Sequence, residues 1–198
     1  MLPVAAFSGE GEKERGVRIG FDLSSAALSF MEGEGIDAGF TADMTWGDDY
    51  FIIADAGYVN HIRTGPGYEL SQDALYTRAG VDYSIYSFEN DVIATGFRYG
   101  FSTYRHKGKN VLVEDDYWGD YRGIMPANNL RSHWIEGVFS LKTELFADVF
   151  IGWTLRGKVL LQRGEEENME EWHIPGYGLS GQSSTLGFNF YIFYRIPF

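Results

Sequence analysis

Residues 186–198 read LGFNFYIFYRIPF, and every second position, beginning with Leu186, is apolar. This row holds Leu186, Phe188, Phe190, Ile192, Tyr194, Ile196 and Phe198, and the other row includes the polar or small residues Gly187, Asn189 and Arg195. Successive side chains of a β-strand point to opposite faces of its sheet. This period of two therefore predicts a strand with one apolar and one polar face.

The same alternation recurs in seven earlier segments, which begin near Gly16, Ile36, Tyr50, Arg78, Ile93, Ile135 and Val149. Short turns predicted at 47–49, 89–91 and 146–148 alternate with longer links predicted at 31–35, 64–73, 106–130 and 164–182. Bacterial outer-membrane barrels have short periplasmic turns and longer extracellular loops. The sequence therefore predicts an all-β fold, an eight-stranded antiparallel up-and-down transmembrane β-barrel over residues 16–198. Both termini would be periplasmic and the long loops extracellular.

The volume of the barrel interior decides which row of side chains points inward. A soluble barrel such as a lipocalin also alternates, with its apolar row inside. The interior of an eight-stranded barrel is only just wide enough for side chains, and the apolar row, rich in aromatic rings, would overfill it. Glycine relieves crowding in a narrow interior, and the polar row holds Gly20, Gly39, Gly57, Gly80, Gly96, Gly100, Gly152 and Gly187. We therefore expect the polar row to face inward.

Aromatic residues near the strand ends predict a girdle at each membrane interface. The inner girdle would comprise Trp46, Tyr50, Phe88, Phe146, Phe150 and Phe198. The outer girdle would comprise Phe30, Tyr58, Tyr76, Tyr104 and Trp134.

The charges of the inward row balance. Its bases are Arg18, Arg78, Arg98, Lys142, Arg156, Lys158 and Arg195, and its acids are Asp22, Asp37, Asp43, Asp55, Asp82, Glu136 and Glu144. Charges in a narrow, poorly hydrated space are tolerable when they are paired. An ion-selective pore would instead carry rings of one sign. The pattern predicts an ion-pair network that closes the lumen.

Composition and motifs argue against several other functions. The formal charge of −12 argues against nucleic-acid binding, and the absence of cysteine excludes disulfides and thiolate metal sites. Ser132, His133 and Glu136 are the best candidates for a lipid-directed enzyme, but an adjacent Ser-His pair on a strand points to opposite faces. We predict no catalytic, cofactor-binding or metal-binding residues, no cofactor and no enzyme activity.

The acidic run 165–171 has two possible interpretations. It is either a solvated surface or a site that binds a cation, and both remain open.

Two further segments carry expectations about processing and partners. Residues 1–15 are expected to be a flexible N-terminal leader or signal remnant. The predicted loop 106–130 is apolar enough to need a surface to pack against, either the barrel mouth or a partner. Its candidate partner contacts are Tyr117, Trp118, Tyr121, Ile124 and Met125.

The last strand also carries a resemblance. Its residues Phe190, Ile192, Tyr194, Ile196 and Phe198 resemble the C-terminal assembly signal of outer-membrane barrels, which the barrel assembly machinery recognises. Residues 16–198 resemble small outer-membrane barrels of the Bacteroidota. The resemblance implies an integral outer-membrane location, in contact with outer-membrane lipid and lipopolysaccharide.

The function predicted first is a structural or accessory, partner-binding role, such as a subunit of a larger outer-membrane complex like the barrel assembly machinery. The alternative is a stand-alone barrel for envelope stability or adhesion. A small-solute pore or a lipid-modifying enzyme ranks below both.

Overall fold

A computed structural model describes residues 16–32, 35–65, 68–88, 91–113, 121–164 and 173–197. Its elements in chain order are β1 (Gly16–Asp22), α1 (Leu23–Glu32), β2 (Gly35–Trp46), β3 (Tyr50–Gly65), β4 (Tyr68–Phe88), β5 (Asp91–Val113), β6 (Tyr121–Phe146), β7 (Val149–Gln162), β8 (His173–Ile174), β9 (Gly178–Leu179) and β10 (Ser184–Pro197). Residues 1–15, for which we expect a leader, lie outside the described part of the chain.

Eight of the strands form one closed barrel. Its strands follow one another in the order β1-β10-β7-β6-β5-β4-β3-β2, and all neighbours are antiparallel. Barrel strands that are adjacent in space are also consecutive barrel strands along the chain, and β10 pairs with β1 to close the barrel. The predicted eight-stranded up-and-down barrel is confirmed, and β8 and β9 form a separate two-stranded hairpin.

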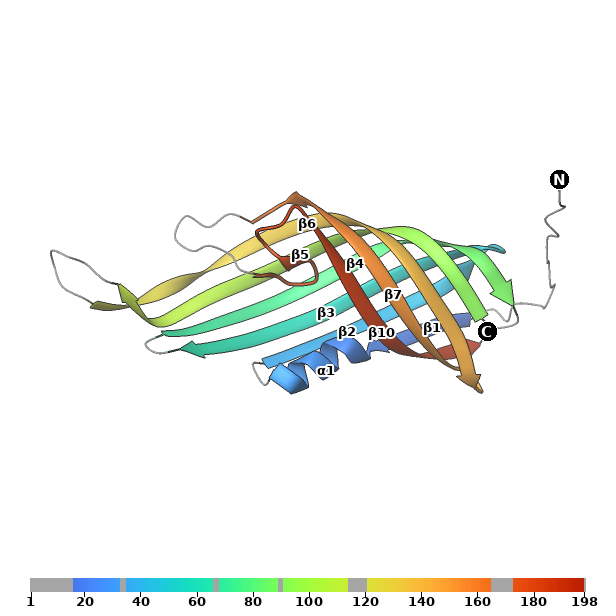
Figure 1. Ribbon diagram of the computed structural model, residues 1–198, viewed down its shortest axis with the longest axis horizontal. Helices are drawn as coiled ribbons and strands as arrows, with labels where there is room; N and C mark the ends of the chain where they lie inside the picture. The colour runs from blue at the N-terminus through green and yellow to red at the C-terminus, as the bar shows by residue number, and fades with distance from the viewer. Residues whose placement is uncertain are drawn as a thin grey trace.

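The barrel wall is much taller on one side than on the other (Figure 1). β4, β5 and β6 have 21, 23 and 26 residues, whereas β1 has 7 and β7 and β10 have 14 each. We call the parts of β3–β6 within 60–65, 68–73, 105–113 and 121–131 the extension. It lies at the opposite end from the turns that the structure shows at 47–49 and 147–148.

The extension corrects two of the predicted links. We expected loops at 64–73 and 106–130, but β3 pairs with β4 as far as Gly65 and Tyr68, and β5 pairs with β6 as far as Val113 and Tyr121. The regular alternation that identified the other strands fades here, because polar residues such as Asn60 and Arg105 occupy the outward row and Gln72 and His106 the inward row. Backbone pairing continues without that signal.

A helix replaces part of the first predicted strand. We expected a strand that begins near Gly16 and a link at 31–35, but the strand ends at Asp22 and the chain forms α1 directly after it. The Asp22 Oδ1 atom accepts hydrogen bonds from the backbone N–H groups of Ser24 (3.0 Å) and Ser25 (3.2 Å). A carboxylate in this position satisfies amide groups that the first helical turn leaves free, so Asp22 is the N-cap that starts α1.

Helix α1 fills a gap in the barrel wall. β1 pairs with β2 only as far as Phe40 and with β10 only as far as Tyr191. The remaining edges, residues 35–39 of β2 and 184–190 of β10, have α1 between them, and α1 contacts both strands. We call this region the seam. Within the described residues, no helix is long and apolar enough to cross a membrane.

Side chains follow an inside-out pattern. Outward-facing Phe97, Leu186 and Phe146 are 81%, 88% and 66% exposed, whereas twelve charged residues of the described part of the chain are buried inside. Helix α1 also has its apolar side chains outside and its polar ones inside. Leu23 and Phe30 are exposed, while Ser24, Ser25 and Ser29 face the strands.

Four of the predicted girdle rings lie inside the barrel. Tyr76, Tyr104, Trp134 and Phe150 are all buried, at no more than 4% exposure. Trp46, Tyr50, Phe88, Phe146, Phe30 and Tyr58 are exposed as expected, and Phe198 lies outside the described residues. The inward glycines make room for the interior rings: a Cβ on Gly57 would lie 2.1 Å from the Tyr76 ring, and one on Gly100 would lie 2.2 Å from that of Trp134.

Candidate functional site

The interior is lined by ion pairs in successive layers. Near the end with the short turns, Asp43 on β2 binds two bases, Arg18 through Nε at 2.6 Å and Lys142 through Nζ. Phe51 lies beneath both of them, with its ring centroid 4.9 Å from the Arg18 guanidinium carbon. Phe51 and Ile53 broke the polar row in the sequence, and they form a small apolar cluster with Val92 and Ala94.

The central layer surrounds one carboxylate with three arginines. Asp55 Oδ2 lies 2.9 Å from Arg98, 3.3 Å from Arg156 and 3.6 Å from Arg78. These side chains come from β3, β4, β5 and β7, so the layer spans the barrel interior. A buried carboxylate in such a setting holds together cations that would otherwise repel one another.

Two further acids complete this layer. Glu136 on β6 accepts from Arg156 at 2.8 Å and lies 3.2 Å from Arg78 Nε, and it also accepts from the Trp134 indole N–H at 2.7 Å. Asp82 accepts from Arg98 at 3.0 Å. Each of these acids is at most 5% exposed, so the layer excludes bulk water.

At the end with the short turns, Arg195 makes the closing contacts. Its Nε atom donates to Asp148 at 2.8 Å, and its guanidinium lies 3.8 Å from Glu144. Glu144 also accepts from the backbone N–H of Asp148 at 3.0 Å. Sequence reasoning missed Asp148, because it belongs to a turn and the alternation extends only along strands.

Three residues predicted for the network have other contacts. Asp22 caps α1 and accepts from Asn189 at 2.7 Å, and Asn189 in turn accepts from Arg156. The backbone N–H of Asp37 donates to Ser29 Oγ. Lys158 Nζ donates to the carbonyls of Gly176 (2.8 Å) and Tyr177 (3.0 Å) instead of to a carboxylate.

Those carbonyls belong to residues 173–182, which we call the plug hairpin. We expected 164–182 to be an outer link, but this part of it folds into the barrel mouth. Ile174 and Tyr177 are fully buried in a cluster with Val59, Ala74, Tyr76, Tyr104, Leu130 and Trp134. Arg78 also donates to Gly176 O at 3.0 Å, and Gln72 donates to His173 O at 3.0 Å. The plug hairpin therefore closes the lumen above the ion-pair layers.

Residues 7–198 match the model of the family described as "Domain of unknown function (DUF6048)". The chain belongs to the DUF6048 family. No curated protein has a sequence that matches it. The match covers the whole barrel, so the ion-pair layers, the seam and the plug hairpin all lie within the DUF6048 domain.

The enzyme candidates of this DUF6048 domain do not converge. Ser132 faces the interior and contacts the Tyr104 hydroxyl at 2.8 Å, whereas His133 faces outward and contacts Tyr99 and Gln162. Glu136 is engaged by arginines. No group of three or more His, Asp or Glu side chains suited to a metal occurs among the described residues.

The structure describes only some of the other residues predicted for sites of the DUF6048 domain. Tyr117, Trp118 and the acidic run 165–171 lie outside the described residues. Tyr121, Ile124 and Met125 belong to β6, whose backbone alone is described there, so this stretch is strand and not loop. In the predicted assembly signal, Ile192, Tyr194 and Ile196 face outward on β10, Phe190 is half-buried, and Phe198 is outside the described part.

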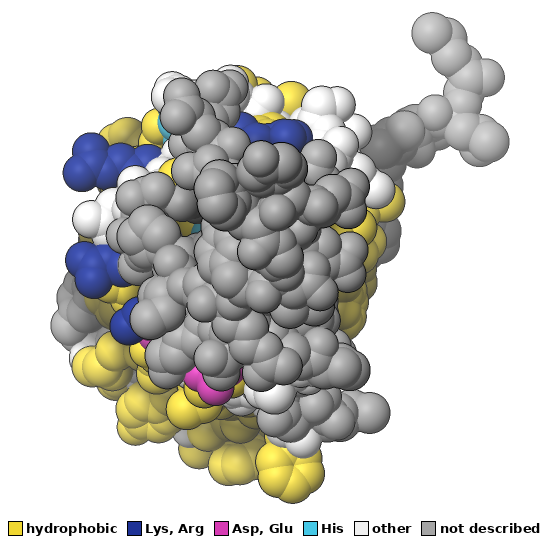
Figure 2. All heavy atoms as spheres, turned by 90° about the vertical axis from the view of Figure 1, so that its left-hand side faces the viewer, with side chains coloured by type: hydrophobic (Ala, Val, Ile, Leu, Met, Phe, Trp, Pro, Cys, Tyr) yellow, Lys and Arg dark blue, Asp and Glu magenta, His cyan; other side chains and the backbone are white. Residues whose placement is uncertain are grey.

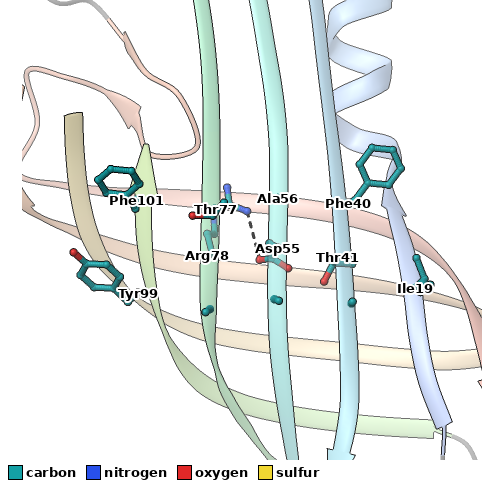
Figure 3. A pocket seen from close by; sticks show the side chains of 12 residues that line it. Ile19, Phe40, Thr41, Asp55, Ala56, Thr77, Arg78, Tyr99 and Phe101 are labelled. Carbon is teal, nitrogen blue, oxygen red and sulfur yellow. Dashed lines mark ion pairs between the residues drawn. The ribbon is translucent and has the colours of Figure 1, made fainter. Parts of the chain in front are cut away.

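The outer wall of the DUF6048 barrel has a depression of about 720 Å³ on β2–β4 (Figure 3). Small residues form its floor in two rows across β2–β4: Ala42, Ala54 and Ala79 in one, Ala56 and Thr77 in the other. Ile19 and Phe40 stand on one side, Tyr99 and Phe101 on the other. The depression is apolar and open to the outside, and the Asp55–Arg78 pair lies behind its floor.

Proposed function

We propose that the chain is an integral outer-membrane β-barrel with a closed lumen, which serves as an accessory, partner-binding component of the envelope. The inside-out distribution of side chains supports the membrane part. Exposing apolar surface to water costs about 25 cal/mol per Å², and the outer wall exposes large rings on every long strand. A hydrocarbon environment removes that cost, and lipid chains would fill the alanine-floored depression.

The height of the apolar belt supports the same proposal. On β2 the outward row runs from Ile36 to Trp46, about 34 Å along the strand at roughly 3.4 Å per residue. A strand tilted by about 40° carries this length across about 25 Å, the height of the apolar band of outer-membrane barrels. On β3 the unbroken apolar row ends at Tyr58; Asn60 follows, and Ile62 lies beyond it.

The observation that carries the accessory role is the closed interior combined with the extension. Layers of ion pairs and the plug hairpin leave no described path for a solute, so we place the function on the outside of the barrel. A membrane-spanning strand needs about 9–11 residues, whereas β6 has 26. The surplus stands beyond the apolar belt as a paired wall, which is a surface suited to a partner in a larger outer-membrane complex.

Membrane insertion and closure are tested together. The full chain should fractionate with outer membranes, resist extraction by alkaline carbonate and shift in mobility on unheated gels. Reconstituted into planar bilayers, it should give no reproducible conductance steps. Recovery in the soluble fraction contradicts the membrane proposal, and stable single-channel openings contradict the closed lumen.

The partner role is tested by photocrosslinking in cells. A photoreactive residue in place of Ile62 or Thr64, on the extension, should give a crosslinked protein band of reproducible mass. The matched controls are Leu155 and Leu186, which are exposed on the low side of the barrel and should give lipid adducts alone. If the extension gives the same adducts as these controls, the stand-alone barrel becomes the better account.

A further inference from the structure

Exposed basic side chains gather at one place on the outer wall. Among the described side chains, the exposed bases are Arg105, Lys107, Arg131 and Arg163, and every other described Lys or Arg side chain is buried in the interior. All four lie toward the extension end of the barrel. In Figure 2, which faces that end, Lys and Arg side chains lie mainly along one side, next to hydrophobic ones.

Three of these bases share one face of β5 and β6. Arg105 and Lys107 are two residues apart on β5, so their side chains point the same way, about 7 Å apart along the strand. Arg131 on β6 pairs with Thr103, which makes it a diagonal neighbour of Arg105 at about 7–8 Å. We call Arg105, Lys107 and Arg131 the basic patch.

The basic patch begins where the apolar belt ends. Below it on β5 the outward row holds Phe97, Tyr99 and Phe101, and Thr103 separates these rings from Arg105. In a membrane-inserted barrel this places the three cations at the level of the lipid headgroups.

A depression of about 320 Å³ lies beside the patch. Its lining includes Arg105 and Asn129 on one side and Tyr58 and Leu75 on the other, so apolar groups lie beside polar ones. Arg105 Nε donates to Asn129 Oδ1, which holds the guanidinium along the outer face. Asp73 also lines the depression opposite Arg105, but its Oδ1 accepts from Asn60 and from the Tyr58 hydroxyl.

The sign of the patch is opposite to that of the whole chain, which has a net charge of −12. At the other end of the barrel the exposed charges include Asp48, Asp49 and Asp91. Clustered guanidinium and ammonium groups are the usual partners of phosphate, through charge-assisted hydrogen bonds. We propose that the basic patch and its depression bind the phosphate-bearing headgroup of an anionic membrane lipid. This inference rests on the proposed membrane location and adds a site to it.

The experiment is a lipid titration of the purified full chain followed by native mass spectrometry. The probe is diphosphoryl lipid A, with phosphatidylcholine as the zwitterionic comparison. The triple variant Arg105→Ser, Lys107→Ser, Arg131→Ser removes the patch. Each base near a membrane surface contributes about a fivefold factor in affinity, so the triple variant should bind lipid A on the order of a hundredfold more weakly.

The matched control is Arg163→Ser, which removes an exposed arginine at the same end. Arg163 donates to Ser180 O of the plug hairpin and lies off the patch, so lipid A binding should stay within about twofold of the unchanged chain. Asp73→Asn, which removes the acid beside the patch, should raise the affinity.

Two results would overturn the proposal. One is a triple variant that binds lipid A as well as the unchanged chain does. The other is full displacement of lipid A by a molar excess of inorganic phosphate, which would make free phosphate the ligand. If the basic patch does not bind lipid, the chain is still found in the outer-membrane fraction. If the membrane proposal is wrong, the chain is absent from that fraction, so the two failures are distinguishable.

Discussion

Ser29 Oγ on helix α1 accepts a hydrogen bond from the backbone N–H of Asp37 on β2 at 2.6 Å. On the other side of the seam, the backbone N–H of Phe190 on β10 donates to Ser24 Oγ at 3.3 Å. Two serines of one helix therefore serve backbone groups on both open strand edges. A buried backbone amide without a partner is costly, so these contacts explain how a barrel wall can contain a helix.

Replacing Ser29 by alanine should weaken the seam. The change leaves the Asp37 amide without its serine acceptor, at a cost of about 1–3 kcal/mol in the free energy of unfolding. Hydrogen exchange should also speed up at Asp37 while the β5–β6 ladder is unaffected. Urea unfolding in detergent and residue-resolved exchange measure the two effects. Ser184→Ala, at an exposed position of β10, is the control, and equal exchange at Asp37 in both variants would contradict the role of Ser29.

Asp55→Asn should be among the most damaging conservative substitutions in the chain. It keeps the shape of the side chain but removes the negative charge between Arg98, Arg156 and Arg78. Breaking a buried ion pair by removing one partner typically costs about 3–5 kcal/mol. Asp91→Asn, an exposed acid whose hydrogen bond from Thr143 an amide oxygen can keep, should change stability by at most about 0.5 kcal/mol. Similar unfolding midpoints for the two variants would show that the central layer tolerates an unbalanced charge.

The orientation of the barrel can be tested with single cysteines, because the chain has none of its own. We expect Thr64→Cys, at the extension, to react with a membrane-impermeant maleimide on intact cells. Asp48→Cys, in the turn between β2 and β3, should react only after the outer membrane is permeabilised. The reverse labelling pattern would place the extension in the periplasm.

Much of the barrel could be predicted from the period of two. This alternation identifies the strands and the inward row. It also predicts an inward position for two rings, those of Tyr76 and Trp134, that we expected in the outer girdle. Tyr76 shares the parity of inward Arg78, and Trp134 shares that of Glu136, so both rings should have been expected inside. Their position near the strand ends suggests girdle rings instead, so parity along the strand is the better guide to which face a ring occupies.

The remaining features depend on contacts that leave no periodic signal. Asp22 starts a helix because its carboxylate meets the amides of Ser24 and Ser25, yet the same residues fit the alternation of β1. The extension is paired although its sequence does not alternate regularly between apolar and polar residues. The plug hairpin enters the barrel because Lys158 and Arg78 bind its carbonyls, a relationship between segments far apart in sequence.

The plug hairpin depends on the backbone at Gly176. This residue has a φ of +80°, a conformation that costs a side-chain-bearing residue about 1–2 kcal/mol. A Cβ there would also lie 2.7 Å from the ring of Tyr76. Gly176→Ala should therefore displace the carbonyl that binds Arg78 and Lys158 and release the hairpin from the mouth.

The release should appear as faster proteolytic cleavage within 173–182, while the barrel remains folded and heat-modifiable on gels. Gly181→Ala is the matched control, because nothing lies within 4 Å of its added Cβ, and its cleavage should match that of the unchanged chain. We further expect the Gly176→Ala barrel to stay non-conducting in planar bilayers, since the layer around Asp55 closes the lumen independently of the hairpin. Conductance in this variant alone would show that the plug hairpin, and not the ion pairs, is what closes the barrel.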